Sequence, residues 1–379
     1  MTPEAAIRLA LGQARRVLGT TYPNPAVGAI VFRGSTVLGR GATQPPGGPH
    51  AEAVALAKAI AKHGKAKVRG ASVATTLEPC CFTGRTPPCT KAIADAGIRR
   101  VIVGCKDPHA RVNGRGSTAL RRAGVEVEVG VLEDECQKQH RGFISLCVKG
   151  RPFVTLKLAT TLDGRIATAA GESRWITGPA SREWVHQARS RSDAVMVGSG
   201  TALADDPELS ARKGKRIIHR PVRLLVDSKL RVATDAKLYK GLHPGRTDKI
   251  AGFETWVLCK SKSQGRRAVA ATGAKLVDVP TQGRHLNLSA AMKQLGKLGL
   301  TNVFVEGGGE LAAALLRANL VDEIHWFQAP TLIGGDGRAA LGPLSLERLR
   351  DAVSLEDVSV RRRGDDVHIT ASVRNRKRR

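Results

Sequence analysis

The sequence is poor in acidic and aromatic residues. Its 379 residues include 33 Asp and Glu against 61 Lys and Arg, so the formal net charge is +28. Only 3% of the residues are aromatic, which leaves few side chains on which single-stranded bases could stack. The basic excess runs through both halves, and a dispersed positive field favours small anionic substrates such as phosphates. We therefore expect a small phosphorylated substrate and no specific nucleic-acid partner.

Two further absences concern the location of the protein. No run of about 18 apolar residues is present, so we expect neither a membrane span nor a membrane partner. The N-terminus lacks the basic segment followed by an apolar one that is typical of a signal peptide. The seven cysteines are odd in number, and their spacing fits a metal site better than a disulfide framework. These features predict a cytoplasmic protein.

The length of the chain is sufficient for two domains, each with its own core. Strand and helix patterns alternate along both halves, which indicates an α/β fold. The first half should end near a helix over residues 133–143, and residues 149–152 are expected to form the linker. We place the domains at residues 1–148 and 149–379.

Four residues in the first half form a pattern typical of zinc enzymes. An imidazole and two thiolates, from His50, Cys80 and Cys89, are ligands that zinc favours, and three protein ligands leave a fourth position for water. Bound zinc lowers the pKa of such a water to about 7. Glu52 is the expected acid and base, because zinc deaminases combine His-x-Glu with a later Pro-Cys. The alternative is a zinc-free loop in which the thiols occur by chance.

The spacing of the two cysteines narrows the class of deaminase. Deaminases that act on nucleic acids carry Cys-x-x-Cys, whereas here residues 81–88, which include Gly-Arg-Thr-Pro-Pro, separate Cys80 from Cys89. This segment, His-Ala-Glu at 50–52 and Tyr-Pro-Asn-Pro-Ala-Val-Gly at 22–28 together resemble the bifunctional deaminase–reductases of the riboflavin pathway. Later motifs belong to the same pattern, so the resemblance covers nearly the whole chain.

The resemblance implies a fold, two activities and two cofactors. The fold would be a cytidine-deaminase-like three-layer α/β/α domain followed by a dihydrofolate-reductase-like α/β domain. The first domain, with one zinc ion, would hydrolytically deaminate 2,5-diamino-6-(5-phosphoribosylamino)pyrimidin-4(3H)-one. The second would use NADPH to reduce the ribosyl group of 5-amino-6-(5-phosphoribosylamino)uracil to ribityl. We also expect a homo-oligomer.

In the first domain, the resemblance implies substrate contacts from Asn24 and Arg85. A guanidinium can form two parallel hydrogen bonds to the oxygens of one phosphate group, so Arg85 is suited to binding a phosphate. Both residues also fit turns, so a structural role is the alternative for each. Family members usually carry a His two residues after the first Cys, and here that position is Phe82.

In the second domain, the resemblance assigns two sets of contacts. Those to the sugar phosphate would come from Lys157, Ser173, Arg189, Leu209, Arg212 and Glu306. Those to NADPH would come from Ala159, Trp175, Thr201, Asp205, Ser228, Gly308, Gly309, Glu310, Leu311, Ala312, Ala313 and Ala314. Glycines between a strand at 302–305 and a helix at 311–317 let backbone N–H groups approach phosphate. The Rossmann pattern Gly-x-Gly-x-x-Gly is absent, which disfavours Rossmann binding.

Two other classes of function are compatible with parts of the sequence. A tRNA or nucleobase zinc deaminase with an accessory domain would share the zinc residues but would need no triple-glycine loop. A basic RNA-binding protein without catalytic activity would need neither zinc nor NADPH.

Overall fold

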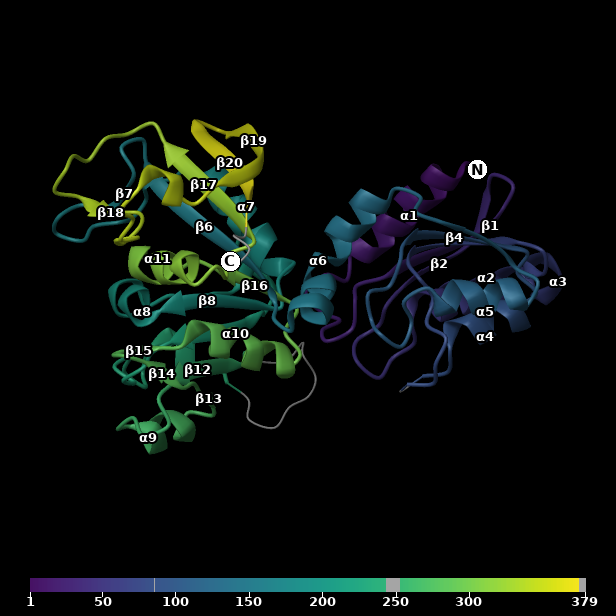
Figure 1. Cartoon of the computed structure of the whole chain (residues 1–379), viewed down its shortest axis with the longest axis horizontal. Helices are drawn as coiled ribbons and strands as arrows, with labels where there is room; N and C mark the ends of the chain where they lie inside the picture. The colour runs from purple at the N-terminus through teal and green to yellow at the C-terminus, as the bar shows by residue number, and fades with distance from the viewer. Residues whose placement is uncertain (85, 243–252, 375–379) are drawn as a thin grey trace. The chain divides into compact units, whose positions relative to one another are not determined.

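The structure, a computed structural model, describes residues 1–84, 86–242 and 253–374. It divides into two compact units, Met1–Gly150 and Arg151–Arg379 (Figure 1). The domain boundary expected between residues 148 and 149 lies in the last turn of helix α6 (Glu133–Lys149). The range 133–143 predicted for this helix ended too early, because α6 continues to Lys149. The helix ends at Gly150, whose φ of 65° is left-handed.

The first unit is built on a five-stranded sheet with the order β2-β1-β3-β4-β5. Strand β1 pairs antiparallel with β2 and β3, whereas β3, β4 and β5 run parallel. Because parallel strands end at the same edge of a sheet, the loops after β3 and β4 lie close together. The strands are β1 (Gly28–Arg33), β2 (Thr36–Ala42), β3 (Ser72–Leu77), β4 (Arg100–Cys105) and β5 (Glu126–Val129).

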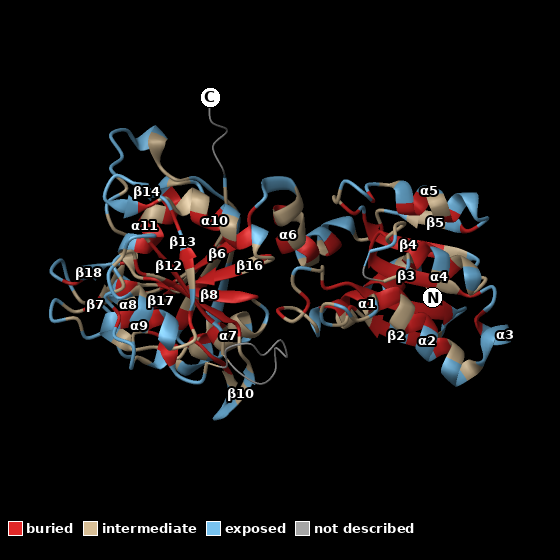
Figure 2. Cartoon of the chain, turned by 90° about the horizontal axis from the view of Figure 1, so that it is seen from below, coloured by how far each residue is buried: buried red, intermediate tan, exposed pale blue. Residues whose placement is uncertain are grey.

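Helices cover both faces of this sheet. Helices α1 (Pro3–Arg15) and α6 lie on one face, and the other face carries α2 (Ala51–His63), α4 (Cys89–Asp95) and α5 (Arg115–Arg122) (Figure 1). A short helix, α3 (Lys65–Val68), follows α2. The buried residues gather in the strands between the two helix layers (Figure 2). This is the three-layer α/β/α arrangement that the family resemblance implied.

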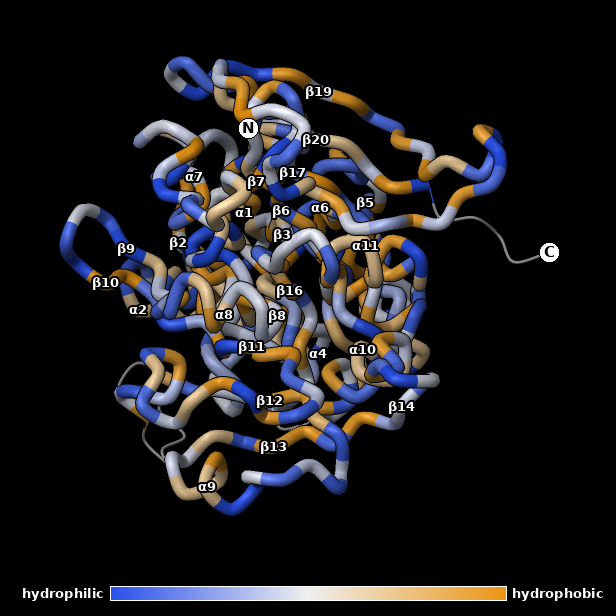
Figure 3. The backbone as a smooth tube through the Cα atoms, turned by 90° about the vertical axis from the view of Figure 1, so that its left-hand side faces the viewer, coloured by the Kyte–Doolittle hydropathy of each residue, from blue (hydrophilic) through white to orange (hydrophobic). Residues whose placement is uncertain are grey.

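The second unit is built on a nine-stranded sheet with the order β13-β12-β11-β8-β16-β6-β17-β20-β19, which Figure 3 shows from β19 at the top to β13 at the bottom. The strands from β13 to β17 in this order run parallel, and β20 and β19 close the sheet as an antiparallel hairpin. They are β6 (Phe153–Thr161), β8 (Ala194–Gly198), β11 (Val222–Val226), β12 (Thr255–Cys259), β13 (Lys275–Asp278), β16 (Asn302–Val305), β17 (Glu323–Ala329), β19 (Leu355–Arg363) and β20 (Asp366–Val373). The sequence patterns predicted the hairpin but missed β17.

Helices also cover both faces of the larger sheet. Val185 of helix α7 (Pro179–Ser190) and Val269 of helix α9 (Arg266–Ala271) belong to the same buried apolar cluster as Val195, Val197 and Leu225. Helices α10 (Leu288–Lys297) and α11 (Gly309–Arg317) lie on the opposite face (Figure 2). The remaining elements are short: β7 (Arg165–Ala167), α8 (Ser199–Asp205), β9 (Ala211–Lys213), β10 (Arg216–His219), η1 (Lys237–Tyr239), β14 (Thr281–Gln282), β15 (His285–Leu286), β18 (Arg338–Ala339) and η2 (Leu349–Asp351).

The edge strand β19 exposes apolar side chains. Leu355, Val358 and Val360 are 43%, 58% and 63% exposed, and Figure 3 shows hydrophobic stretches along this strand. Across the described residues, the structure contains no helix with the length and apolar character that a membrane crossing requires.

One buried histidine fastens α6 to the sheet of the first unit. His140 is 2% exposed, and its Nε2 lies 3.0 Å from the hydroxyl oxygen of Thr76 in β3. The same oxygen accepts a hydrogen bond from the backbone N–H of Gly28. Burial lowers the pKa of His140 to about 4. The imidazole is therefore neutral in the folded unit at neutral pH.

This histidine should make the first unit sensitive to acid. Below about pH 6.5 the unfolded chain binds a proton at His140 that the folded unit does not bind until about pH 4, so folding stability falls as the pH falls through this window. At pH 5 the loss is on the order of 2 kcal/mol. Urea unfolding at pH 7 and pH 5 should show a smaller loss for His140→Gln than for the wild type. Equal losses would contradict this role.

Candidate active sites

In the first unit, three segments bring the expected zinc ligands together. His50 is the residue before α2, Cys80 follows β3, and Cys89 is the first residue of α4. Helix α2 packs very closely on β2, because a Cβ atom on Gly41 would lie only 2.1 Å from the carbonyl oxygen of Ala51. This close approach carries His50 toward the loop that holds both cysteines.

The distances between the ligand atoms fit a single metal ion. His50 Nδ1 lies 3.5 Å from Cys80 Sγ and 3.4 Å from Cys89 Sγ, and all three atoms lie within 4.8 Å of one another. In a tetrahedral zinc site, the usual bond lengths place a nitrogen and a sulfur ligand about 3.6 Å apart. The residues present therefore fit zinc in both chemistry and spacing.

The charges of the cluster also suit a cation. Hydrogen bonds from Cys89 and His50 lower the pKa of the Cys80 thiol to about 4, so its sulfur is a thiolate at neutral pH. The same Cys80 contact raises the pKa of His50. Glu52 is 4% exposed, and burial raises its pKa to about 7, which suits a group that both accepts and donates protons.

A second buried carboxylate, Glu78, holds the loop that carries Cys80. It accepts hydrogen bonds from the backbone N–H groups of Asp107, Gly114 and Ser117, at 3.3, 2.9 and 2.8 Å, and from the Ser117 hydroxyl at 3.0 Å. Glu78 therefore ties the end of β3 to the loop after β4. The sequence analysis missed this residue, although its place just before Pro-Cys was a usable signal.

The expected substrate contacts of the first unit are only partly described. Arg85 lies outside the described residues. Asn24 is half-buried in a turn closed by Thr21, and no hydrogen bond to its side-chain amide is found within the described part of the chain. Phe82 stacks on His109 with a centroid separation of 5.9 Å, and Arg111 covers its ring at 3.8 Å.

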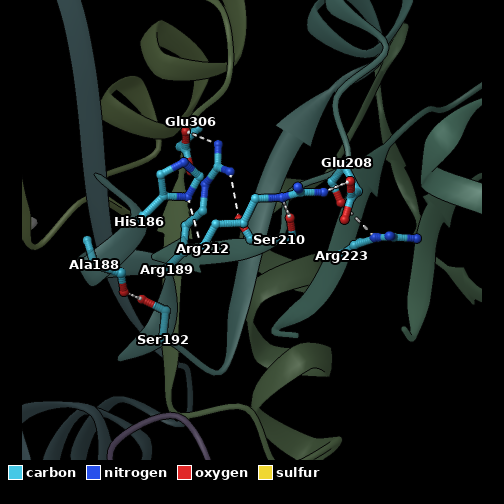
Figure 4. Close-up of polar contacts among 9 residues, drawn as sticks. All are labelled: His186, Ala188, Arg189, Ser192, Glu208, Ser210, Arg212, Arg223 and Glu306. Atoms are coloured by element: carbon cyan, nitrogen blue, oxygen red, sulfur yellow. Dashed lines mark hydrogen bonds and ion pairs between the residues drawn. The ribbon is translucent and has the colours of Figure 1, made fainter. Parts of the chain in front are cut away.

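In the second unit, Glu306 and Arg189 form a bidentate ion pair (Figure 4). Arg189 Nε lies 2.5 Å from Glu306 Oε1, and the second pair of atoms is 2.9 Å apart. Their side chains are only 16% and 10% exposed. Lys157, in the neighbouring strand β6, is close enough to feel both charges, and its pKa is lowered mainly by burial. Three of the expected sugar-phosphate residues thus form one charged cluster.

Other expected sugar-phosphate residues lie along the segment after α8. Arg212 Nε donates to the Ser210 hydroxyl at 3.0 Å, and the guanidinium pairs with Glu208 at 2.5 Å (Figure 4). Leu209 lies between them with a φ of 57° and a buried side chain, so only its backbone faces this segment. Glu208 and Ser210 were not predicted, since neither residue type marks a site on its own.

The triple-glycine loop allows close backbone packing at the start of α11. A Cβ atom on Gly309 would lie 2.9 Å from the carbonyl oxygen of Ala339, and one on Gly307 would lie 2.7 Å from Leu311 Cδ2. The Gly308 N–H donates to the Thr201 hydroxyl at 2.9 Å. The first N–H groups of α11 have no partner within a helix, which makes its N-terminus a suitable place for a phosphate.

The remaining expected cofactor residues differ in exposure. Trp175 is 71% exposed, with Arg182 at 4.8 Å from its ring, and Asp205 accepts a hydrogen bond from the Ser173 hydroxyl at 3.4 Å. Ser228 follows β11, and its carbonyl oxygen accepts from the Ser263 hydroxyl at 2.7 Å. Ala159, in β6, and Ala314, in α11, are half-buried, whereas Leu311, Ala312 and Ala313 of α11 are buried.

These two sites define a class of protein: a zinc deaminase joined to a second enzyme. The description "Cytidine and deoxycytidylate deaminase zinc-binding region" matches residues 1–105, and "RibD C-terminal domain" matches residues 152–369. The chain belongs to the RibD family of riboflavin biosynthesis proteins. It is therefore a bifunctional deaminase and reductase, and the predicted family, fold, zinc and NADPH are confirmed. The alternative of a tRNA or nucleobase deaminase is not favoured.

Individual relatives extend over almost the whole chain. The riboflavin biosynthesis protein RibD of Escherichia coli is 37% identical, with 97% of this chain and 98% of that protein covered. The RibD of Aquifex aeolicus is 35% identical, with 96% of each covered. Among solved structures, Acinetobacter baumannii RibD, form 1, has a TM-score of 0.85 at 32% identity and covers 98% of this chain and 99% of its own.

The cysteine cluster yields a test by metal content. Cys89→Ser should reduce bound zinc from one per chain to a small fraction, because one of three protein ligands is lost. Elemental analysis of the purified variants measures this directly. Cys81→Ser is the matched control, since Cys81 neighbours the cluster while its sulfur contacts the carbonyl oxygen of Arg111. Full zinc in Cys89→Ser, or an equal loss in the control, would refute the ligand assignment.

Proposed function

We propose that residues 1–148 deaminate 2,5-diamino-6-(5-phosphoribosylamino)pyrimidin-4(3H)-one and that residues 149–379 then reduce the ribosyl group of the product to ribityl. The main support is the convergence of His50, Cys80 and Cys89 beside the buried carboxylate of Glu52. A Thermotoga maritima protein, named a diaminohydroxyphosphoribosylaminopyrimidine deaminase and 5-amino-6-(5-phosphoribosylamino)uracil reductase, has a TM-score of 0.83 at 30% identity, with 98% of each chain covered.

In the deaminase, the reaction exchanges an amino group for the oxygen of water. Zinc, held by His50, Cys80 and Cys89, would supply the Lewis acidity that makes water a nucleophile at neutral pH. Glu52 takes one proton from the water as its oxygen bonds to the ring carbon that bears the amino group, and passes this proton to the ring nitrogen. It then moves the second proton from the new hydroxyl to the amine, and the carbon–nitrogen bond breaks to release ammonia. Its pKa of about 7 lets the same carboxyl serve in both directions. Asn24 and Arg85 bind the substrate.

In the reductase, the chain binds and orients two anionic molecules. NADPH would supply the hydride that reduces the sugar. Lys157, Arg189, Arg212 and Ser173 bind the sugar phosphate, with Leu209 contributing its backbone. Glu306 accepts from a sugar hydroxyl while its pair with Arg189 fixes both side chains. The remaining contacts bind NADPH: Ala159, Trp175, Thr201, Asp205, Ser228, Gly308, Gly309, Glu310, Leu311, Ala312, Ala313 and Ala314.

Product analysis of two variants separates the two activities. With the diaminopyrimidine substrate and NADPH, Glu52→Gln should release no ammonia, because the proton carrier is lost while the zinc ligands remain. Lys157→Ala should release ammonia normally but accumulate the deaminated ribosyl product, because a cation at the sugar-phosphate site is lost. Mass spectrometry identifies the products, and elemental analysis checks zinc in each variant.

Each outcome tests a separate half of the proposal. If zinc-loaded Glu52→Gln releases ammonia at the wild-type rate, Glu52 is not the proton carrier of the deaminase. If Lys157→Ala forms the ribityl product at the wild-type rate, Lys157 does not bind the sugar phosphate in the reductase. Wild-type protein that leaves NADPH unconsumed with the deaminated substrate would refute the reductase half alone.

We infer further that the protein is a cytoplasmic homo-oligomer without a specific nucleic-acid partner. The apolar side chains of Leu355, Val358 and Val360 on edge strand β19 support self-association, since such an edge is usually covered. The unpaired state of the described cysteines fits a reducing compartment. Light scattering should give a molar mass of at least two chains, each of 40.3 kDa. A monomer at micromolar concentration, or tight salt-sensitive tRNA binding, would contradict the inference.

A further inference from the structure

Three arginine side chains of the second unit meet at the two residues Glu208 and Ser210 (Figure 4). The guanidinium of Arg212 contacts both, since it pairs with the Glu208 carboxylate and donates to the Ser210 hydroxyl. Arg189 donates to the Ser210 carbonyl oxygen at 3.0 Å. Arg223 donates to the Glu208 carbonyl oxygen at 2.9 Å. This short segment is therefore held by guanidinium groups from three elements, α7, β9 and β11.

Arg223 differs from the other two arginines in its burial. It is 1% exposed, whereas the side chains of Arg189 and Arg212 are 16% and 36% exposed. A ligand cannot contact a side chain that is covered on all sides. Any effect of Arg223 on binding must therefore act through the residues that it holds.

The contacts of the Arg223 guanidinium are mainly to the backbone. Besides Glu208, the guanidinium donates to the carbonyl oxygens of Leu238 and Lys240, at 3.1 and 2.9 Å. The ring of Phe253 covers it at 3.4 Å. Burial lowers the pKa of Arg223 to about 10, so the group is still charged at neutral pH. Within the described residues it has no ion pair, so three carbonyl oxygens and one ring face satisfy this buried charge.

A guanidinium suits this arrangement better than an ammonium group would. Its Nε donates to Glu208, and one terminal nitrogen donates to both Leu238 and Lys240. These nitrogens belong to one rigid plane, whereas the three donors of a lysine surround a single nitrogen. The guanidinium of Arg223 therefore fixes the backbone of Glu208 relative to η1 and the residue that follows it.

The 208–210 segment in turn orients the charged cluster of the reductase. Arg189 is bonded to Glu306 on one side and to the Ser210 carbonyl oxygen on the other, so a shift of the segment would change the direction of its guanidinium. Lys157 is close enough to affect the pKa of Glu306, and in the described part of the chain its ammonium group makes no hydrogen bond. The cluster thus has a cation available to an anionic ligand.

We propose that Arg223 is a positioning residue of the reductase: it fixes the 208–210 segment and, through it, the two arginines that bind the sugar phosphate. This inference rests on the proposed reductase function. Without the three hydrogen bonds of Arg223 the segment can shift, and the partners that Arg189 and Arg212 share move with it. Binding of the phosphorylated sugar then weakens, although the residues that touch it are unchanged.

A purely structural role is the alternative, and the kinetics of Arg223→Lys distinguish the two. The full chain is assayed with NADPH and the deaminated substrate, 5-amino-6-(5-phosphoribosylamino)uracil. A positioning role predicts that KM for this substrate rises about 10-fold, as for the loss of one charge-assisted hydrogen bond, while KM for NADPH is unchanged. A purely structural role predicts fewer active molecules, so kcat per chain falls while both KM values stay the same.

Arg151→Lys is the matched control for the loss of a buried guanidinium in the same unit. Arg151 is 8% exposed and forms a bidentate pair with Asp322, at 2.6 and 2.9 Å. These two residues precede β6 and β17. This variant should be less stable than the wild type and should keep both KM values. The deaminase rate of each variant serves as an internal reference, since it depends on the other unit.

Phe253→Leu tests the same role in a milder way and keeps the guanidinium in place. Loss of the ring face should loosen Arg223 and raise KM for the deaminated substrate about threefold. Thermal unfolding of each variant checks that it is folded. Phe253→Leu decides the question if Arg223→Lys does not fold.

The outcomes separate this inference from the function on which it rests. An unchanged KM for the deaminated substrate in folded Arg223→Lys, or an equal rise of both KM values, would overturn the positioning role. If that variant does not fold, an unchanged KM in Phe253→Leu would overturn it. Wild-type protein that leaves NADPH unconsumed would instead refute the reductase function itself. Normal wild-type turnover with unchanged KM values in the variants would leave that function standing without a role for Arg223.

Discussion

The deaminase site depends on how closely helix α2 approaches strand β2. Cβ atoms on Gly39 and Gly41 would lie 2.2 Å and 2.1 Å from carbonyl oxygens of α2, so both positions require glycine. This contact sets the position of His50 at the start of the helix. The opposite side of the cluster is held by Glu78, whose four hydrogen bonds fix the loop with Cys80. The scaffold thus positions the three expected zinc ligands.

Both units place their polar groups where parallel strands end. Glu78 and Cys80 follow β3, Glu306 follows β16, and Ser228 follows β11. At these ends the backbone N–H groups of loops and helix starts are not used by the sheet, so they remain available to anions and carboxylates. The same physical property of the parallel sheet therefore supports two unrelated reactions in one chain.

The sequence was sufficient for features with a local pattern. The expected zinc residues have a characteristic spacing, and β20, the second strand of the hairpin, alternates apolar and polar residues. Strand β17 was missed because His325 interrupts its apolar pattern, and this polar residue is tolerated only because it bonds to His368 and Glu323, at 3.0 and 2.9 Å. The pairing of Arg189 with Glu306 was also invisible, since those residues lie 117 positions apart. Contacts of this kind exist only in the folded chain.

The buried side chain of Leu209 affects how mutational data on the reductase should be interpreted. Its side chain is part of the apolar core, while its backbone lies in the segment between Glu208 and Ser210. Truncating this leucine would disturb folding and the local backbone together, so lost turnover in an alanine scan would be ascribed to misfolding. Replacing the 209 peptide bond by an ester, which keeps the side chain, would separate the two contributions.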